Sequence, residues 1–132
     1  MTISLLIITH DNIGASLVDT ATSMLGVTPL HIDTISVKKN ANPDDLITHA
    51  KNLIKENTST LVLTDMYGST PSNIACHLNE PGITQIVSGI NLPMLVRILN
   101  YPQLELDDIV NKALSGGKDG VLTCKMEHTQ ND

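Results

Sequence analysis

Apolar residues come in short runs that alternate with longer stretches in which they recur every three or four positions. The short runs are typical of buried strands, and the longer stretches indicate helices that bury one face. Strands are expected over residues 5–8, 31–37, 60–64 and 83–88, and helices over residues 13–25, 43–54 and 71–80, around 95–99, and over 106–114. Strands that alternate with helices in this way are typical of βαβ units, in which the strands run parallel.

The ends of several helices carry typical capping residues. Asn42 is expected as an N-cap, with Pro43 as the first residue inside its helix. Thr70 and Pro71 are expected to begin the following helix in the same way. Gly26 follows the last apolar position of the first helix, where a glycine commonly ends a helix in the left-handed conformation.

The whole pattern predicts one α/β domain with an open, mainly parallel, doubly wound sheet of strand order 2-1-3-4. The run at 31–37 is more polar and suits a sheet edge, whereas 60–64 is apolar enough for a central strand. Two glycines, Gly116 and Gly117, are expected to turn the chain. Residues 121–124 would then add a C-terminal antiparallel edge strand, and residues 125–132 form a polar tail expected to be disordered.

Composition and charge exclude several classes of function. The chain has 14 acidic and 8 basic residues, a formal charge of −6, and no basic cluster that could hold a nucleic-acid backbone, so nucleic-acid binding is not expected. No segment approaches the roughly 20 apolar residues of a membrane span, and the first residues do not resemble a signal peptide. Cys76 and Cys124 form no CxxC pair and are expected to be reduced, which favours the cytoplasm. Neither a metal nor another cofactor is expected, because no metal-ligand spacing links His31, His49, His77 and His128.

Polar residues with chemical potential follow two neighbouring strands of the expected sheet. His10 follows the first strand and Asp65 the third, so both are expected at the edge where ligands bind. A carboxylate bonded to one imidazole nitrogen fixes the tautomer and leaves the other nitrogen free as a nucleophile. Gly68, Ser69 and Thr70 open a helix, where backbone N–H groups and two hydroxyls could hold an anion. These are the parts of a phosphohistidine site.

A purely structural role is the alternative for the same residues. His10 would then cap the first helix, and Asp65 would form an Asx turn. The spacing alone leaves both interpretations open.

Three motifs add a resemblance to a known family. They are Thr9-His10, then Thr64-Asp-Met-Tyr-Gly-Ser-Thr-Pro-Ser-Asn73, and then Ser88-Gly-Ile-Asn-Leu-Pro-Met-Leu95. In this order and at these intervals they resemble the IIA domain of the mannose class of the bacterial phosphoenolpyruvate-dependent sugar phosphotransferase system. The resemblance covers about residues 1–124, which would form one IIA-type phosphoryl-carrier domain.

The resemblance implies a phosphotransferase with a phosphohistidine intermediate. His10 would accept phosphate from the carrier protein HPr and pass it to a IIB protein, for sugar uptake or regulation. Asp65 would orient His10, Thr70 and the backbone before it would contact the phosphoryl group, and Asn91 and Pro93 would shape a neighbouring loop. The family also implies a homodimer in which the C-terminal strand crosses to the partner.

The sequence departs from the family pattern at Asp11, where the family often has glycine, so a negative charge follows the proposed nucleophile. No IIB-like segment follows, and the acceptor is expected to be a separate protein. One alternative function is a regulatory module that senses phosphorylation without a role in transport. Another is a phosphotransfer subunit for a dihydroxyacetone kinase, although the stretch at 89–93 favours the mannose class.

Overall fold

A four-stranded parallel sheet, ordered β2-β1-β3-β4, forms the centre of the molecule, as predicted. It is seen in a computed structural model that describes residues 3–54 and 59–125. Along the chain the elements are β1 (Ser4–His10), α1 (Ile13–Leu25), β2 (His31–Val37), α2 (Pro43–Leu53), β3 (Thr60–Thr64), α3 (Thr70–Cys76), β4 (Thr84–Ser88), α4 (Leu92–Leu99) and α5 (Leu106–Asp119).

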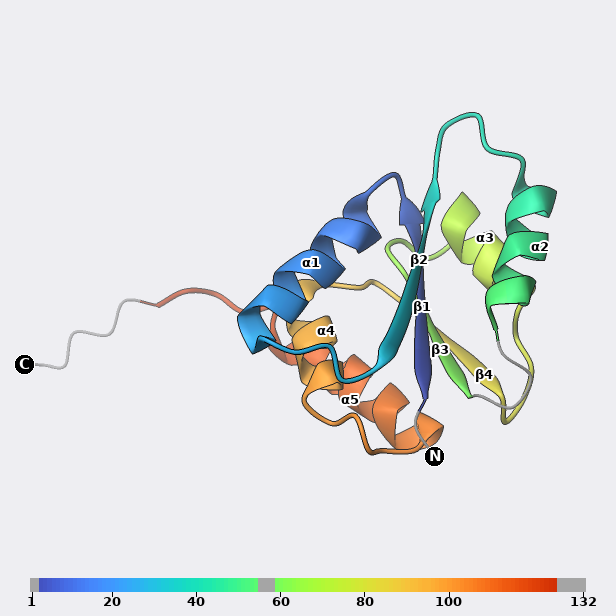
Figure 1. The fold of residues 1–132 in the computed structure, drawn as a ribbon. Helices are drawn as coiled ribbons and strands as arrows, with labels where there is room; N and C mark the ends of the chain where they lie inside the picture. Colours follow the sequence, from blue (N-terminus) through green and yellow to red (C-terminus); the bar gives the residue numbers. More distant parts are fainter. Residues whose placement is uncertain (1–2, 55–58, 126–132) are drawn as a thin grey trace, which may run out of the picture.

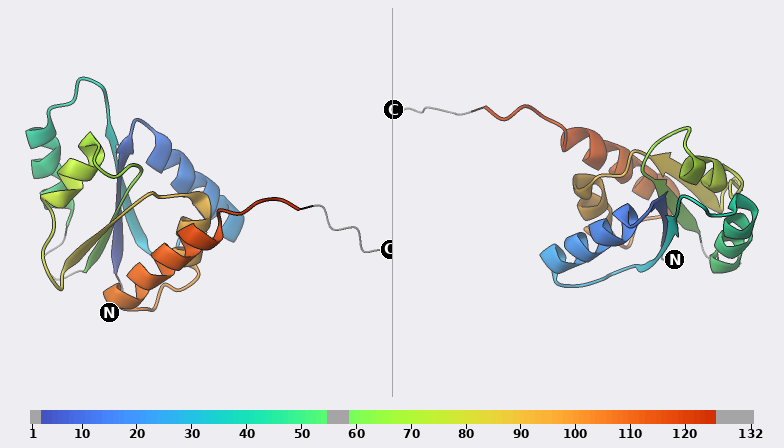
Figure 2. Two further views of the ribbon diagram at one scale, coloured as in Figure 1. Left: turned by 180° about the vertical axis from the view of Figure 1, so that it is seen from behind. Right: turned by 90° about the horizontal axis from the view of Figure 1, so that it is seen from above.

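Helices cover both faces of the sheet, because alternate residues of the central strands point to opposite sides. Leu5 and Ile7 of β1 pack in the core shared with α1, α4 and α5, whereas Leu6 and Ile8 pack in the core shared with α2 and α3. Figures 1 and 2 show the two layers on either side of the sheet. Both faces of β1 and β3 are therefore buried, and the carboxyl ends of these two strands meet at one edge.

Local capping signals explain where several helices begin. The Asn42 side chain accepts hydrogen bonds from the backbone N–H groups of Asp44 and Asp45, which confirms the predicted start of α2. Gly26 ends α1 in the left-handed conformation, also as predicted. The start of α3 was predicted wrongly, because Ser69 is its N-cap and Thr70 is already inside the helix.

The C-terminal part of the prediction was wrong about where the last helix ends. Helix α5 continues through Gly116 and Gly117 instead of ending before them. Both glycines face α4 at close range: an added Cβ would lie 2.6 Å from Arg97 Cβ at the first position and 2.8 Å from Met94 Cε at the second. They allow the two helices to pack closely, which is the reason for glycine here.

The expected edge strand at residues 121–124 does not join the sheet of its own chain, and its expected crossing to a partner concerns a second copy. In the described part of the chain these residues belong to no sheet; they are exposed and lead away from the body (Figure 1). A strand needs a neighbouring strand to accept and donate its backbone hydrogen bonds, and this segment leaves the domain without meeting one. The polar tail predicted beyond it lies, except for Lys125, outside the described residues.

None of the described helices is long and apolar enough to cross a membrane.

Candidate functional site

The fold brings His10 and Asp65 into direct contact, although 55 positions separate them in sequence. β1 pairs with β3 in a register that aligns Ile8 with Thr64, so both chains leave the sheet at the same edge. The His10 Nδ1 atom lies 2.8 Å from Asp65 Oδ2, and the His10 backbone N–H donates to the same oxygen at 3.1 Å. One carboxylate therefore holds both the backbone and the ring of the histidine.

The other oxygen of the Asp65 carboxylate is also hydrogen-bonded, since Oδ1 accepts from the Met66 N–H at 3.1 Å. Burial opposes the charged form, but the hydrogen bonds from the His10 side chain, from the His10 backbone and from the backbone of Asp65 itself together lower the pKa of Asp65 below its ordinary 3.8. Asp65 is thus a carboxylate at neutral pH and acts only as an acceptor.

This lowered pKa predicts a pH dependence of stability. Because the folded protein holds the Asp65 proton less tightly than the unfolded chain does, the carboxylate stabilises the fold above pH 3.8, and the stabilisation is lost as the pH falls through the lower, folded-state value. We expect the difference in unfolding free energy between wild type and Asp65→Asn to be constant near neutral pH and to shrink below pH 3.8. Urea unfolding at a series of pH values measures it. A difference that grew in acid would contradict the sign.

The tautomer of His10 follows from its partner. Since a carboxylate can only accept, Nδ1 of the neutral ring carries the hydrogen, and Nε2 keeps its lone pair. The His10 side chain is 48% exposed, whereas that of Asp65 is 13% exposed. The arrangement therefore offers a fixed imidazole with a nucleophilic nitrogen accessible from solvent.

The start of α1 uses residues other than the His10 ring. Asn12 is the N-cap residue of α1, and the Thr9 hydroxyl accepts from the Gly14 N–H at 2.8 Å. Thr9 is fully buried, so its hydroxyl is part of the interior. None of these contacts at the start of α1 involves the His10 side chain, so they do not support the alternative in which His10 caps this helix.

The predicted anion-binding residues follow Asp65 in a tight loop. Gly68 has a φ of +84°, a conformation that favours glycine. The Ser69 hydroxyl donates to the Met66 carbonyl at 2.6 Å, so its hydrogen is used within the loop. Thr70 is exposed and lines a cavity together with His10. Of the three residues, Thr70 is the one that lines the cavity of His10.

This cavity has a volume of about 360 Å³. It is lined by His10, Asp11, Val37, Lys38, Lys39, Ala41, Pro43 and Thr70. Two lysines thus lie beside the histidine, and sequence reasoning did not connect them with it. The available signal was their position directly after the strand that neighbours the first one.

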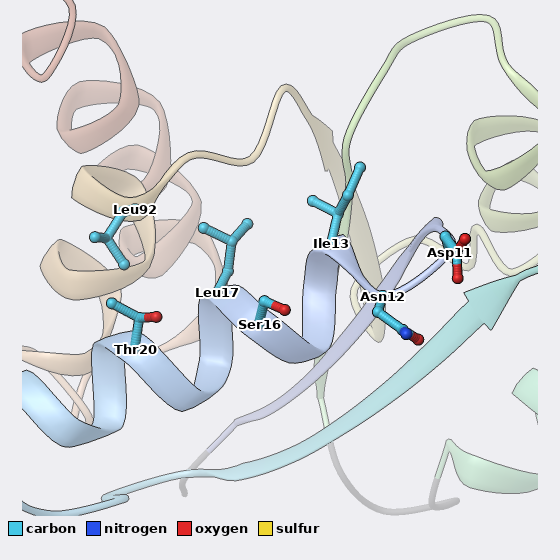
Figure 3. Close-up of a pocket in the computed structure, with 7 residues that line it drawn as sticks. All are labelled: Asp11, Asn12, Ile13, Ser16, Leu17, Thr20 and Leu92. Atoms are coloured by element: carbon cyan, nitrogen blue, oxygen red, sulfur yellow. The ribbon is translucent and has the colours of Figure 1, made fainter.

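A second, more apolar hollow of about 550 Å³ lies on the other flank of the turn between β1 and α1. Figure 3 shows Ile13 and Leu17 of α1 and Leu92 of α4 along it. Ile13 is 46% exposed, and Tyr67 in the loop after Asp65 is 84% exposed. Exposed apolar side chains in the segments that follow His10 and Asp65 are typical of a surface that contacts another protein.

The predicted loop residue Asn91 stabilises the fold next to the site. Its side chain caps α4 by accepting from the Met94 N–H at 2.9 Å and donates to the Gly117 carbonyl at 3.1 Å. The N–H groups of Gly89 and Ile90 both donate to the Thr64 carbonyl, the residue before Asp65. The stretch after β4 therefore buttresses the end of β3.

Within residues 3–54 and 59–125, no group of three or more His, Cys, Asp or Glu side chains could hold a metal ion.

Comparison with solved structures gives the same fold. The mannose/sorbose specific IIA subunit of the phosphotransferase system from Enterococcus faecalis is 22% identical, with 98% of this chain and 100% of that chain covered and a TM-score of 0.87. The phosphotransferase system component EIIA from Streptococcus agalactiae is 23% identical, with coverage of 92% and 96% and a TM-score of 0.82. The PTS IIA protein associated with the fucose utilization operon from Streptococcus pneumoniae is 26% identical, with coverage of 93% of both chains and a TM-score of 0.76.

No curated protein matches the sequence. A family model does: EIIA-man, described as "PTS system fructose IIA component", matches residues 4–114, a range that contains His10, Asp65 and the loop after Asp65. The chain therefore belongs to the EIIA-man family of phosphotransferase-system IIA components, which gives it a role in phosphotransfer between proteins.

Proposed function

We propose that the protein is a phosphoryl carrier in which His10 accepts phosphate from phosphorylated HPr and passes it to a IIB protein, for sugar uptake or regulation. The observation that carries this proposal is the 2.8 Å contact between His10 Nδ1 and Asp65 Oδ2, which leaves Nε2 free at an exposed edge of the sheet. Family membership supports the same chemistry.

The transfer needs one nucleophile and no cofactor. His10 Nε2 attacks the phosphorus of the phosphohistidine on the donor, and a new N–P bond forms as the N–P bond of the donor breaks. The electron pair of the broken bond returns to the ring nitrogen of the donor. Nδ1 keeps its hydrogen, and the Asp65 carboxylate stabilises the positive charge that develops on the His10 ring.

Gly68, Ser69 and Thr70 are proposed to bind the phosphoryl oxygens. Thr70 shares the cavity beside His10, and its hydroxyl is the side-chain donor of this set. The hydrogen of the Ser69 hydroxyl is donated to Met66, so Ser69 would contribute mainly through its backbone. Gly68 allows the left-handed turn that aims this backbone.

Exposure of the site fits a protein donor and a protein acceptor. A reacting nitrogen that must meet a second histidine cannot lie in an enclosed pocket, and His10 is half exposed. Ile13 and Tyr67 provide apolar contacts around it, the type of side chain that anchors protein interfaces. A cytoplasmic location, where both partners would be met, agrees with the two free, exposed thiols of Cys76 and Cys124.

A homodimer is part of the proposal. Val121 is 75% exposed and Leu122 is 78% exposed, on an extended segment that leaves the body, while β4 forms an edge of the sheet. An edge strand presents unpaired backbone groups, which a segment from a second copy can satisfy.

We expect the full chain to be dimeric by light scattering and a variant lacking residues 121–132 to be monomeric. A variant lacking only residues 126–132 is the control and should stay dimeric. A dimer that survives the longer deletion would contradict this assembly.

The decisive experiment for the function is incubation of the protein with phosphoenolpyruvate, enzyme I and HPr, followed by intact mass measurement and peptide mapping. One phosphate, labile to acid and mapped to His10, is expected, and a IIB protein should then remove it. If HPr is phosphorylated in the same tube but the protein gains no phosphate, the proposed function is wrong.

A further inference from the structure

The residue after the proposed nucleophile carries a negative charge whose position is set by the backbone. Asp11 has a φ of +44°, in the left-handed region that few residues other than glycine adopt. Its N–H donates to the Val37 carbonyl at 3.0 Å, which prolongs the pairing of β1 with β2 beyond His10. The carboxylate is therefore kept beside the site and lines the same cavity as His10.

Lys38 binds this carboxylate. Its Nζ atom lies 2.5 Å from Asp11 Oδ1 and 3.4 Å from Asn12 Oδ1. The Asn12 oxygen also accepts from the Ser36 hydroxyl at 3.2 Å. The turn between β1 and α1 is thus tied to the end of β2 by a small polar network.

The register of the sheet accounts for this pairing. His10 is aligned with Val37 in the parallel pair of β1 and β2, so the next residues, Asp11 and Lys38, leave the two strands side by side. Lys38 lines the His10 cavity as well. The Asp11 side chain is 69% exposed and the Lys38 side chain is 58% exposed, so water partly screens their charges.

We propose that Lys38 is a positioning residue for phosphoryl transfer: by pairing with Asp11 it fixes and neutralises the carboxylate next to His10. This inference rests on the proposed function of His10. A phosphoryl group brings about two negative charges. An unpaired carboxylate on the adjacent residue would repel that group as it approaches Nε2, and the pair with Lys38 reduces this repulsion.

The test compares the rate of phosphorylation by phosphorylated HPr among single and double variants. Lys38→Met should lower kcat/KM about tenfold, since it leaves one partly screened charge unbalanced near the phosphoryl group. In an Asp11→Asn background the same Lys38→Met substitution should change kcat/KM less than about twofold, because no carboxylate remains to be neutralised. Lys38→Arg keeps the charge and should retain most of the rate.

Ionic strength and a charge control separate this role from a structural one. The defect of Lys38→Met should shrink from low salt to about 1 M salt, where the screening length falls to about 3 Å. Lys51→Met is the charge control. Pro43, in the first turn of α2, lines the His10 cavity, whereas Lys51 lies in the last turn of the same helix. Removing the Lys51 charge should therefore leave the rate unchanged. Thermal unfolding of each variant verifies that it is folded.

The outcomes are distinguishable from those that test the proposed function. A wild-type protein that takes up no phosphate overturns both proposals. If the wild type is phosphorylated, two results overturn only the role of Lys38. One is a Lys38→Met variant that reacts at the wild-type rate. The other is a Lys38→Met substitution that lowers the rate as much in the Asp11→Asn background as it does alone.

Discussion

Replacing His10 by glutamine is expected to abolish phosphorylation by phosphorylated HPr. The glutamine amide is not a nucleophile, but it can donate to Asp65 as the imidazole does, so the loop geometry should survive. The other residues that line the cavity include no second imidazole that could take the place of Nε2. Intact mass spectrometry of wild type and His10→Gln, each with the complete phosphorylation mixture, measures this directly.

The matched control is His49→Gln, since His49 is an exposed histidine on α2. It should gain the same single phosphate as wild type. If His10→Gln still gained a phosphate and His49→Gln did not, the nucleophile would be a different histidine. The site described above would then have no part in the mechanism.

Replacing Asp65 by asparagine is expected to slow phosphorylation by roughly 10²–10⁴-fold without removing it. An asparagine can present its NH₂ group to the ring, which favours the tautomer that carries its hydrogen on Nε2 and blocks the nucleophile. It also removes the charge that stabilises the developing imidazolium. Asparagine has the same size and shape as aspartate and replaces it in a loop, so the fold should be retained. Rapid-quench measurement of the first turnover, with circular dichroism as a check of the fold, gives the rate.

A second histidine–aspartate pair provides the control for this substitution. His31 Nε2 and Asp33 Oδ2 lie 2.8 Å apart on β2, the same distance as in the proposed site. Asp33→Asn should therefore leave the phosphorylation rate unchanged. A rate in Asp65→Asn equal to that of wild type would show that the orientation of the ring does not depend on the carboxylate.

The two substitutions differ in expected effect because the two residues differ in role. In the proposed mechanism His10 forms the bond to phosphorus, so no transfer is expected without it. Asp65 selects one tautomer and stabilises charge, and an imidazole without it still samples the reactive form part of the time. A complete loss in both variants would indicate instead that Asp65 is needed for the local fold, which the acid-stability measurement on the same variant would reveal.

The sequence by itself determined most of the fold and the central contact of the candidate site. Helical periodicity, the cap at Asn42, the edge-strand pattern at 31–37 and the buried run at 60–64 predicted elements that the structure contains. Right-handed parallel crossovers then restrict the sheet to very few strand orders. His10 and Asp65 could be predicted to meet because parallel strands end at the same edge, a consequence of topology that needs no side-chain detail.

Local signals failed where the deciding neighbour is distant in sequence. Gly116 and Gly117 resemble a turn, because glycine is a common helix terminator, yet both lie inside α5, and Arg97 Cβ of α4 leaves no room for a Cβ at Gly116. Residues 121–124 resemble a strand by composition. Whether such a segment becomes one depends on a pairing partner, and its own sequence does not reveal where that partner is.

Only the tertiary structure decided which charges surround His10. Asp11 and Lys38 are 27 positions apart, and each lies in a turn, where no periodic pattern constrains the side chain. Their contact depends on the register between β1 and β2, which a shift of one residue would destroy. Register is set by the packing of both faces of the sheet at once. The sequence could therefore propose His10 as a candidate nucleophile, whereas the charges around His10 became visible only in the assembled fold.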